Sequence, residues 1–134
     1  AAPGSGAGKT AVAAALAGAL RARGLEVQPF KVGPDFVDGM GLSKACGRVV
    51  RNLDGYMMGR EACLKSFHAA SRGADFCVVE GVMGLYDGRE GASEEGSTAE
   101  MAKWLGCPVI LVLDCWTSSR SVAAVIKGFQ GFDK

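Results

Sequence analysis

Residues 2–10 read APGSGAGKT, and they run directly into an alanine-rich stretch that predicts a helix over residues 9–23. Closely spaced glycines let backbone N–H groups converge on a phosphate at the positive end of such a helix. The side chain of Lys9 can reach the terminal phosphates, and the hydroxyl of Thr10 can hold Mg²⁺. The stretch therefore predicts a phosphate-binding loop and a bound nucleoside triphosphate.

The loop departs from the general pattern G-x-x-x-x-G-K-[ST] at Pro3, where the pattern has glycine. A glycine-rich turn that only caps a helix would explain the glycines but not the Lys-Thr pair at the helix entrance. The intact pair therefore favours nucleotide binding. The loop residues expected to bind the nucleotide are Gly4, Ser5, Gly6, Ala7, Gly8, Lys9 and Thr10.

The composition predicts one domain and excludes several partners. Among 134 residues, 49% are hydrophobic, which is enough for a single core, and the formal net charge is +1. Basic residues are scattered among acidic ones, so we expect no nucleic-acid partner, and no apolar run is long enough to suggest a membrane partner. Five cysteines without a C-x-x-C pair indicate reduced thiols and a cytoplasmic location.

The two ends of the chain suggest a fragment. A phosphate-binding loop normally follows a buried strand, yet only two residues precede Pro3. Residues 129–134 follow a helical stretch and lead into no further strand. We therefore expect a domain that is incomplete at both ends and lacks the first strand of its sheet.

Apolar runs alternate with helical patterns, which is typical of an α/β fold of the P-loop NTPase type, with a parallel sheet flanked by helices. Irregular loops follow two predicted strands at the sheet edge where ligands bind in open α/β sheets. The loops are residues 33–52 and 81–96, the strands 26–32, 76–80 and 109–114, and the helices 9–23, 59–72, 97–105 and 120–129. Ser97 and Glu100 have the spacing of a capping box.

Acidic residues lie at or beyond the ends of the predicted strands. Asp35 and Asp38 follow the strand that carries Lys31, although a turn with solvated acids would give the same pattern. Glu80 closes an apolar strand, where a carboxylate usually has a partner such as a metal ion or its water shell. Asp114 also ends a predicted strand, but the residues after it add no support.

Two other polar residues are ambiguous or excluded. Asp54 precedes a predicted helix, so it is equally well explained as an N-cap or as a functional group. His68 has no second histidine in the chain with which to form a metal pair, and we assign it no catalytic role.

Taken together, a series of ordered motifs resembles the ATP-binding synthetase domain of the cobyrinic acid a,c-diamide synthases, within the wider dethiobiotin synthetase-like group of P-loop enzymes. Pro3 is normal for this family, and the resemblance covers nearly the whole chain. The motifs are residues 2–10, 28–35 (QPFKVGPD), 51–54 (RNLD), 79–88 (VEGVMGLYDG), 96–100 (GSTAE) and 120–129.

The resemblance implies that residues 1–134 form an ATP-binding amidoligase domain. Enzymes of this kind use ATP and Mg²⁺ to activate the a- and c-acetate carboxylates of a corrin-type polycarboxylate as acyl phosphates. Ammonia released from glutamine then forms each amide. The family's glutaminase is a separate C-terminal domain that this chain lacks, so none of the five cysteines is expected to be its nucleophile.

The resemblance also implies roles for the polar residues. Mg²⁺ would be held by Thr10 and Glu80, with Asp54 as the third group by analogy with dethiobiotin synthetase. Lys9 and Lys31 would neutralise charge on the nucleotide phosphates. The residues that match catalytic positions of the family are Lys9, Asp35, Asp38 and Asp87, whose acids would orient ring carboxylates or hold the incoming ammonia.

Three alternatives remain open. One is a sibling amidase that acts on nickel-sirohydrochlorin or hydrogenobyrinic acid. The second is a regulatory ATPase of the partition or septum-site kind, whose loop carries an additional lysine where this chain has Gly4. The third is a catalytically silent nucleotide-binding module, against which the intact lysine, threonine and acids argue.

Overall fold

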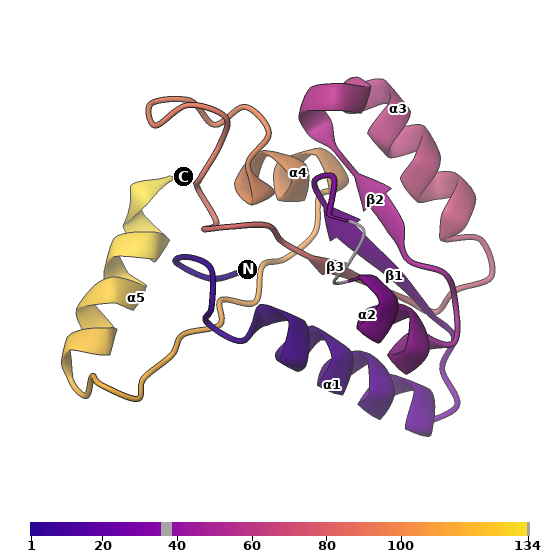
Figure 1. Cartoon of the computed structure of the whole chain (residues 1–134), viewed down its shortest axis with the longest axis horizontal. Helices are drawn as coiled ribbons and strands as arrows, with labels where there is room; N and C mark the ends of the chain where they lie inside the picture. The colour runs from indigo at the N-terminus through magenta and orange to yellow at the C-terminus, as the bar shows by residue number, and fades with distance from the viewer. Residues whose placement is uncertain (36–38, 134) are drawn as a thin grey trace.

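The computed structural model describes residues 1–35 and 39–133 and shows a parallel sheet with helices on both faces (Figure 1). Within the described residues the strands are β1 (Val27–Val32), β2 (Arg51–Leu53) and β3 (Phe76–Glu80), in the spatial order β2-β1-β3. The helices are α1 (Lys9–Ala22), α2 (Gly39–Cys46), α3 (Gly55–Ala70), α4 (Thr98–Leu105) and α5 (Ser121–Phe132). The predicted α/β class is confirmed.

Strand β1 lies at the centre of the sheet. All six of its residues are buried, as a strand covered on both faces requires. In the parallel register Lys31 lies opposite Glu80 of β3, and Val32 lies opposite Leu53 of β2. Because parallel strands end at one edge, the segments that follow β1, β2 and β3 all leave the sheet there.

Two apolar clusters fix the helices to the two faces of the sheet. Figure 1 shows α1 and α2 on one side and α3 and α4 on the other. The cluster under α1 and α2 contains Ala17, Val27, Leu42, Cys46 and Val78. The cluster under α3 and α4 contains Phe30, Val32, Leu53, Cys63 and Met101. Alternate residues of β1 thus enter opposite clusters, because successive side chains of a strand point to opposite faces.

The predicted helix ends are close to those observed. The Ser97 hydroxyl accepts a hydrogen bond from the Glu100 N–H at 3.0 Å, as a capping box requires, but the Glu100 carboxylate accepts from Gly96 rather than from Ser97. Helix α3 begins four residues earlier than predicted and is kinked at Gly59, whose φ is 73°. The Asp54 carboxylate caps this earlier start.

The prediction of irregular structure over residues 33–52 is wrong in part, because this stretch contains α2 and β2. Helix α2 has two glycines in eight residues, which lowers its intrinsic propensity, but it buries Leu42 and Cys46 against α1. Strand β2 has only three residues, too few for a periodic pattern. Tertiary packing, which local propensity does not reveal, explains both elements.

The prediction of a strand over residues 109–114 is also wrong. The segment makes hydrogen bonds to Ala1, whose N–H donates to the Ile110 carbonyl and whose carbonyl accepts from Val112. This one residue supplies two bonds of a parallel ladder, and no strand is assigned there among the described residues. A strand requires a neighbour along several residues, so the apolar run alone does not form one.

Candidate functional site

The phosphate-binding loop enters α1 with its N–H groups uncapped. Gly8 is the N-cap residue, and no side chain accepts a hydrogen bond from the first turn. Gly6 and Gly8 have φ values of 81° and 85°, a conformation that favours glycine. The unpaired N–H groups and the positive end of the helix form an anion site, as the sequence predicts.

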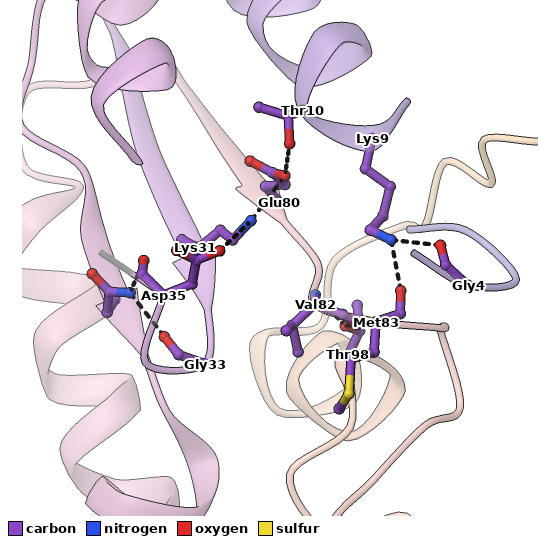
Figure 2. Close-up of polar contacts among 11 residues, drawn as sticks. Gly4, Lys9, Thr10, Lys31, Gly33, Asp35, Glu80, Val82, Met83 and Thr98 are labelled. Atoms are coloured by element: carbon purple, nitrogen blue, oxygen red, sulfur yellow. Dashed lines mark hydrogen bonds and ion pairs between the residues drawn. The ribbon is translucent and has the colours of Figure 1, made fainter. Parts of the chain in front are cut away.

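Lys9 spans the loop and links it to the segment after β3. Its ammonium donates to the carbonyl oxygens of Gly4 and Met83, each at 2.7 Å (Figure 2). Burial, followed by the nearby Lys31 ammonium, lowers the pKa of Lys9, while Glu80 and Asp87 act in the opposite direction. The charges of Lys31, Glu80 and Asp87 therefore all act on this ammonium.

Glu80 is the centre of the cluster shown in Figure 2. Its Oε1 atom accepts hydrogen bonds from the Thr10 hydroxyl at 2.5 Å and from the Lys31 ammonium at 3.0 Å. The side chains of Glu80 and Lys31 are only 2% and 4% exposed. Oε2 of Glu80 is buried and finds no hydrogen-bond partner among the described residues. Since a buried anionic oxygen normally has a partner, this atom is suited to bind a cation.

Asp35 joins the cluster from the other side of Lys31. Its Oδ2 atom lies 3.5 Å from the Lys31 ammonium. The Asn52 amide donates to the carbonyl oxygens of Gly33 at 2.8 Å and of Asp35 at 2.9 Å, and so fixes the turn after β1. Asn52 belongs to the RNLD motif, but the sequence does not predict its role. Only the pairing of β2 with β1 brings it beside this turn.

The segment that carries Asp87 packs against the phosphate-binding loop. Asp87 Oδ2 accepts from the Gly84 N–H at 2.8 Å, and the Leu85 N–H donates to the Ala2 carbonyl at 2.8 Å. A Cβ added at Gly84 would lie 2.6 Å from the Pro3 carbonyl oxygen. Met83 has a φ of 47°, which is unusual for a residue other than glycine. The Asp87 turn and the phosphate-binding loop are thus held in direct contact.

The other predicted acids have different surroundings. Asp54 Oδ1 accepts from the N–H groups of Tyr56 and Met57, each at 3.0 Å, which is the N-cap arrangement that the sequence allowed. Asp114 accepts from the Trp116 N–H at 2.9 Å. Asp38 lies outside the described residues. The structure thus brings together Lys9, Thr10, Lys31, Asp35, Glu80 and Asp87.

The donor set suits a hard divalent cation with few protein ligands. Among the described residues there is no group of three or more His, Cys, Asp or Glu side chains that could hold a metal ion. Mg²⁺ in nucleotide sites usually takes one or two protein oxygens and fills its shell with water and phosphate oxygens. The Thr10 hydroxyl and the unpartnered oxygen of Glu80 fit that pattern.

A cleft of about 420 Å³ lies between the phosphate-binding loop and the start of α5. Residues 3–7 form one wall, and Asp114, Ser118, Ser121, Val122 and Val125 lie on the other. The cleft gives the loop an open side through which a ligand can reach the anion site. No described helix is both long and apolar enough to cross a membrane.

An anion-binding loop at the start of α1, facing a carboxylate at the end of a parallel strand, places the chain in the class of P-loop nucleotide-binding domains. A family profile described as the CobQ/CobB/MinD/ParA nucleotide binding domain matches residues 1–130. The chain belongs to this family.

Curated relatives are about half identical to the chain over the residues that align. A hydrogenobyrinate a,c-diamide synthase of Streptomyces coelicolor is 55% identical over 133 residues, which cover 99% of this chain and 27% of the relative. Cobyrinate a,c-diamide synthases of Leptospira interrogans and Methanosarcina acetivorans are 48% and 46% identical, over 97% and 96% of this chain. The chain spans 29% and 27% of their lengths.

Proposed function

We propose that the chain is the ATP-binding amidoligase part of a cytoplasmic a,c-diamide synthase that acts on a corrin-type polycarboxylate. The observation that carries this proposal is the series of contacts beside the phosphate-binding loop in which Glu80 accepts from Thr10 and Lys31, and Lys31 in turn pairs with Asp35. The relatives named as a,c-diamide synthases support the choice of substrate. These contacts connect the phosphate-binding loop with the carboxylates of Glu80 and Asp35, at the sheet edge where the strands end.

The phosphate half of the site is assigned to the loop and to Lys9, and Lys31 links it to the carboxylate half through Glu80 and Asp35. The N–H groups of residues 4–10 bind the phosphates of ATP, and Lys9 moves from its two carbonyl partners to the terminal phosphates. Thr10 and Glu80 would hold Mg²⁺, and Asp54, whose Oδ1 caps α3, is the proposed third group. Mg²⁺ held by these residues would supply positive charge to offset that of the phosphates.

The carboxylate half of the site is assigned to Asp35, Asp38 and Asp87. A ring acetate oxygen attacks the γ-phosphorus, and the bond to the β-γ bridging oxygen breaks, which yields an acyl phosphate and ADP. Ammonia then attacks the acyl carbon, gives up a proton, and expels inorganic phosphate. The acids orient the ring acetate through Lys31 or bound water, and they accept the proton from the attacking ammonia.

The ammonia is proposed to come from glutamine, released by a glutaminase domain that acts as the partner of this domain. The five cysteines of this chain are free thiols, and burial raises the pKa of Cys46, Cys63, Cys77 and Cys107. A raised pKa disfavours the nucleophilic thiolate. This argues against these four thiols as the nucleophile that cleaves glutamine.

Two macrocycles are candidate substrates, because the relatives are named for both. The Streptomyces relative is named for hydrogenobyrinate, whereas the Leptospira relative is named for cobyrinate. A regulatory ATPase remains the alternative, since the family also includes proteins of the MinD and ParA kind. Gly4, which occupies the position of their additional lysine, argues against it.

The test is an amidation assay on the full-length protein with each macrocycle, ATP, Mg²⁺ and either glutamine or ammonia. We expect a,c-diamide product from at least one macrocycle, with one ATP consumed for each amide. A protein that hydrolyses ATP but amidates neither macrocycle with either nitrogen source would contradict the proposal and favour the regulatory alternative.

A further inference from the structure

A buried lysine lies where the proposed metal ligands meet. The Lys31 ammonium and the Thr10 hydroxyl both donate to Oε1 of Glu80 (Figure 2). With its side chain 4% exposed, Lys31 has almost no contact with bulk water. A buried carboxylate needs a nearby positive charge, and in this structure Lys31 supplies it.

A divalent cation bound at the same carboxylate would repel this ammonium. Both lone-pair directions of Oε1 are taken by Thr10 and Lys31, and Oε2 has no partner among the described residues. A divalent cation at this carboxylate would lie a few ångströms from the ammonium, in a site where water does not screen the repulsion. The ammonium and the metal ion therefore compete for Glu80.

Lys31 has an alternative anion within reach. Oδ2 of Asp35 lies 3.5 Å from its ammonium, on the more exposed side of the cluster. The flexible lysine stem allows the ammonium to leave Glu80 without moving β1. The positive charge of Lys31 also lowers the pKa of Lys9.

We propose that Lys31 is an exchangeable counter-ion: it occupies Glu80 in the metal-free state and moves toward Asp35 when the divalent cation binds. This inference rests on the proposed metal role of Thr10 and Glu80. As a result, the Lys31 ammonium lies beside Asp35, in the carboxylate half of the site, only when the metal ion is bound. Lys31 is thus a positioning residue that links metal binding to the arrangement of the substrate site.

The first experiment measures Mn²⁺ binding to the full-length protein without nucleotide, by the loss of the free Mn²⁺ signal in electron paramagnetic resonance. Lys31→Met removes the competing charge but keeps the length of the side chain, so we expect Mn²⁺ to bind at least about ten-fold more tightly. Lys65→Met, which removes an exposed lysine of α3, is the matched control and should bind Mn²⁺ as the wild type does. Unchanged or weaker binding by Lys31→Met overturns the exchange.

Glu80→Gln separates this inference from the metal site itself. We expect the variant to lose Mn²⁺ binding, because the amide carries no charge. If Glu80→Gln loses Mn²⁺ binding but Lys31→Met binds Mn²⁺ no more tightly than the wild type, the metal site is supported and the exchange is wrong. If Glu80→Gln binds Mn²⁺ as the wild type does, both the metal site and the exchange are wrong.

The second experiment uses the wild type and so does not depend on the folding of a variant. Amine acylation followed by mass spectrometry reports the accessibility of each lysine. Without metal, Lys31 should be protected relative to the exposed Lys65. Saturating Mg²⁺ alone should increase acylation of Lys31 several-fold and leave Lys65 unchanged. Acylation of Lys31 that does not respond to Mg²⁺ overturns the proposal.

Discussion

At the scale of single residues, Glu80 determines how the site is organised. It is buried and ends strand β3, and its one partnered oxygen joins the first turn of α1 to Lys31 of β1. The sequence already singled out this carboxylate, because a charge that closes an apolar strand needs a partner. Its actual partners could not be predicted, because they depend on strand order.

Lys9 and Asp38 are predicted to serve different halves of the site. Lys9→Ala in the full-length protein should weaken ATP binding and lower amidation by about 10²–10³-fold, because a charge on the phosphates is lost. Asp38→Asn should leave ATP affinity nearly unchanged and still abolish most amide formation. ATP titration calorimetry and a product assay check the pair. Equal loss of ATP affinity in both variants would show that the division is wrong.

At the scale of secondary structure elements, the site depends on how the loops after the strands pack. The Asp87 turn lies against the phosphate-binding loop because Gly84 has no side chain. The segment is also fixed to α4, where the Thr98 hydroxyl donates to the Val82 carbonyl and accepts from the Val82 N–H. Binding of phosphate at the loop and the position of Asp87 are therefore structurally linked.

Gly84→Ala is predicted to disturb this packing. The new methyl group would meet the Pro3 carbonyl and the Asp87 carboxylate, so we expect a loss of stability of about 1–3 kcal/mol. Gly91→Ala is the matched control in the same segment, because its added Cβ meets nothing within 4 Å, and it should change stability by less than about 0.5 kcal/mol. Denaturant melts of the full-length protein measure both. Equal stability of the two variants would refute the close packing.

The rate at which each cysteine reacts should depend on how deeply its thiol is buried. Burial raises the pKa of Cys46 in α2, Cys63 in α3 and Cys77 in β3, so little thiolate exists at neutral pH. Iodoacetamide should therefore modify the exposed Cys115 at least about ten-fold faster than these three. The three slow rates should rise as the pH approaches the raised pKa values. Mass spectrometry after timed quenching tests this, and uniform labelling near neutral pH would contradict it.

The elements also show what sequence patterns can and cannot predict. Strands β1 and β3 and four helices are predicted by apolar runs, helical patterns and the Ser97 cap, which are local signals. Helix α2, strand β2 and the contacts of Asn52 were missed because they depend on packing between distant segments. The 109–114 segment was predicted wrongly because apolar composition does not supply a neighbouring strand.

At the scale of the whole molecule, residues 109–116 and helix α5 form a region with exposed apolar groups. Val109 and Ile110 are 44% and 62% exposed, Trp116 is 93% exposed, and no residue of α5 is buried. Figure 1 shows α5 beside the phosphate-binding loop and away from the sheet. The cluster at Glu80 lies on the well-packed side, whereas the cleft beside the loop depends on this less packed region.

Residues 1–134 in isolation are therefore predicted to be marginally stable. A domain has a folding free energy of only about 5–15 kcal/mol, and exposed apolar groups with few backbone partners around residues 109–114 reduce it. We expect the isolated chain to bind ATP weakly or not at all and to amidate nothing, even with ammonia supplied. Calorimetry and a thermal melt check this. Tight Mg²⁺-dependent ATP binding with a cooperative melt would contradict it.

The central claim is that the phosphate and carboxylate halves form one site in which ATP activates a ring carboxylate. Oxygen transfer tests this claim most directly. The full-length protein is given ATP, Mg²⁺, ammonia and a macrocycle whose acetate carboxylates carry oxygen-18, and the released phosphate is analysed by mass spectrometry. If the acetate oxygen attacks ATP, we expect one labelled oxygen in the phosphate for each amide formed. Amide formation with entirely unlabelled phosphate would contradict it.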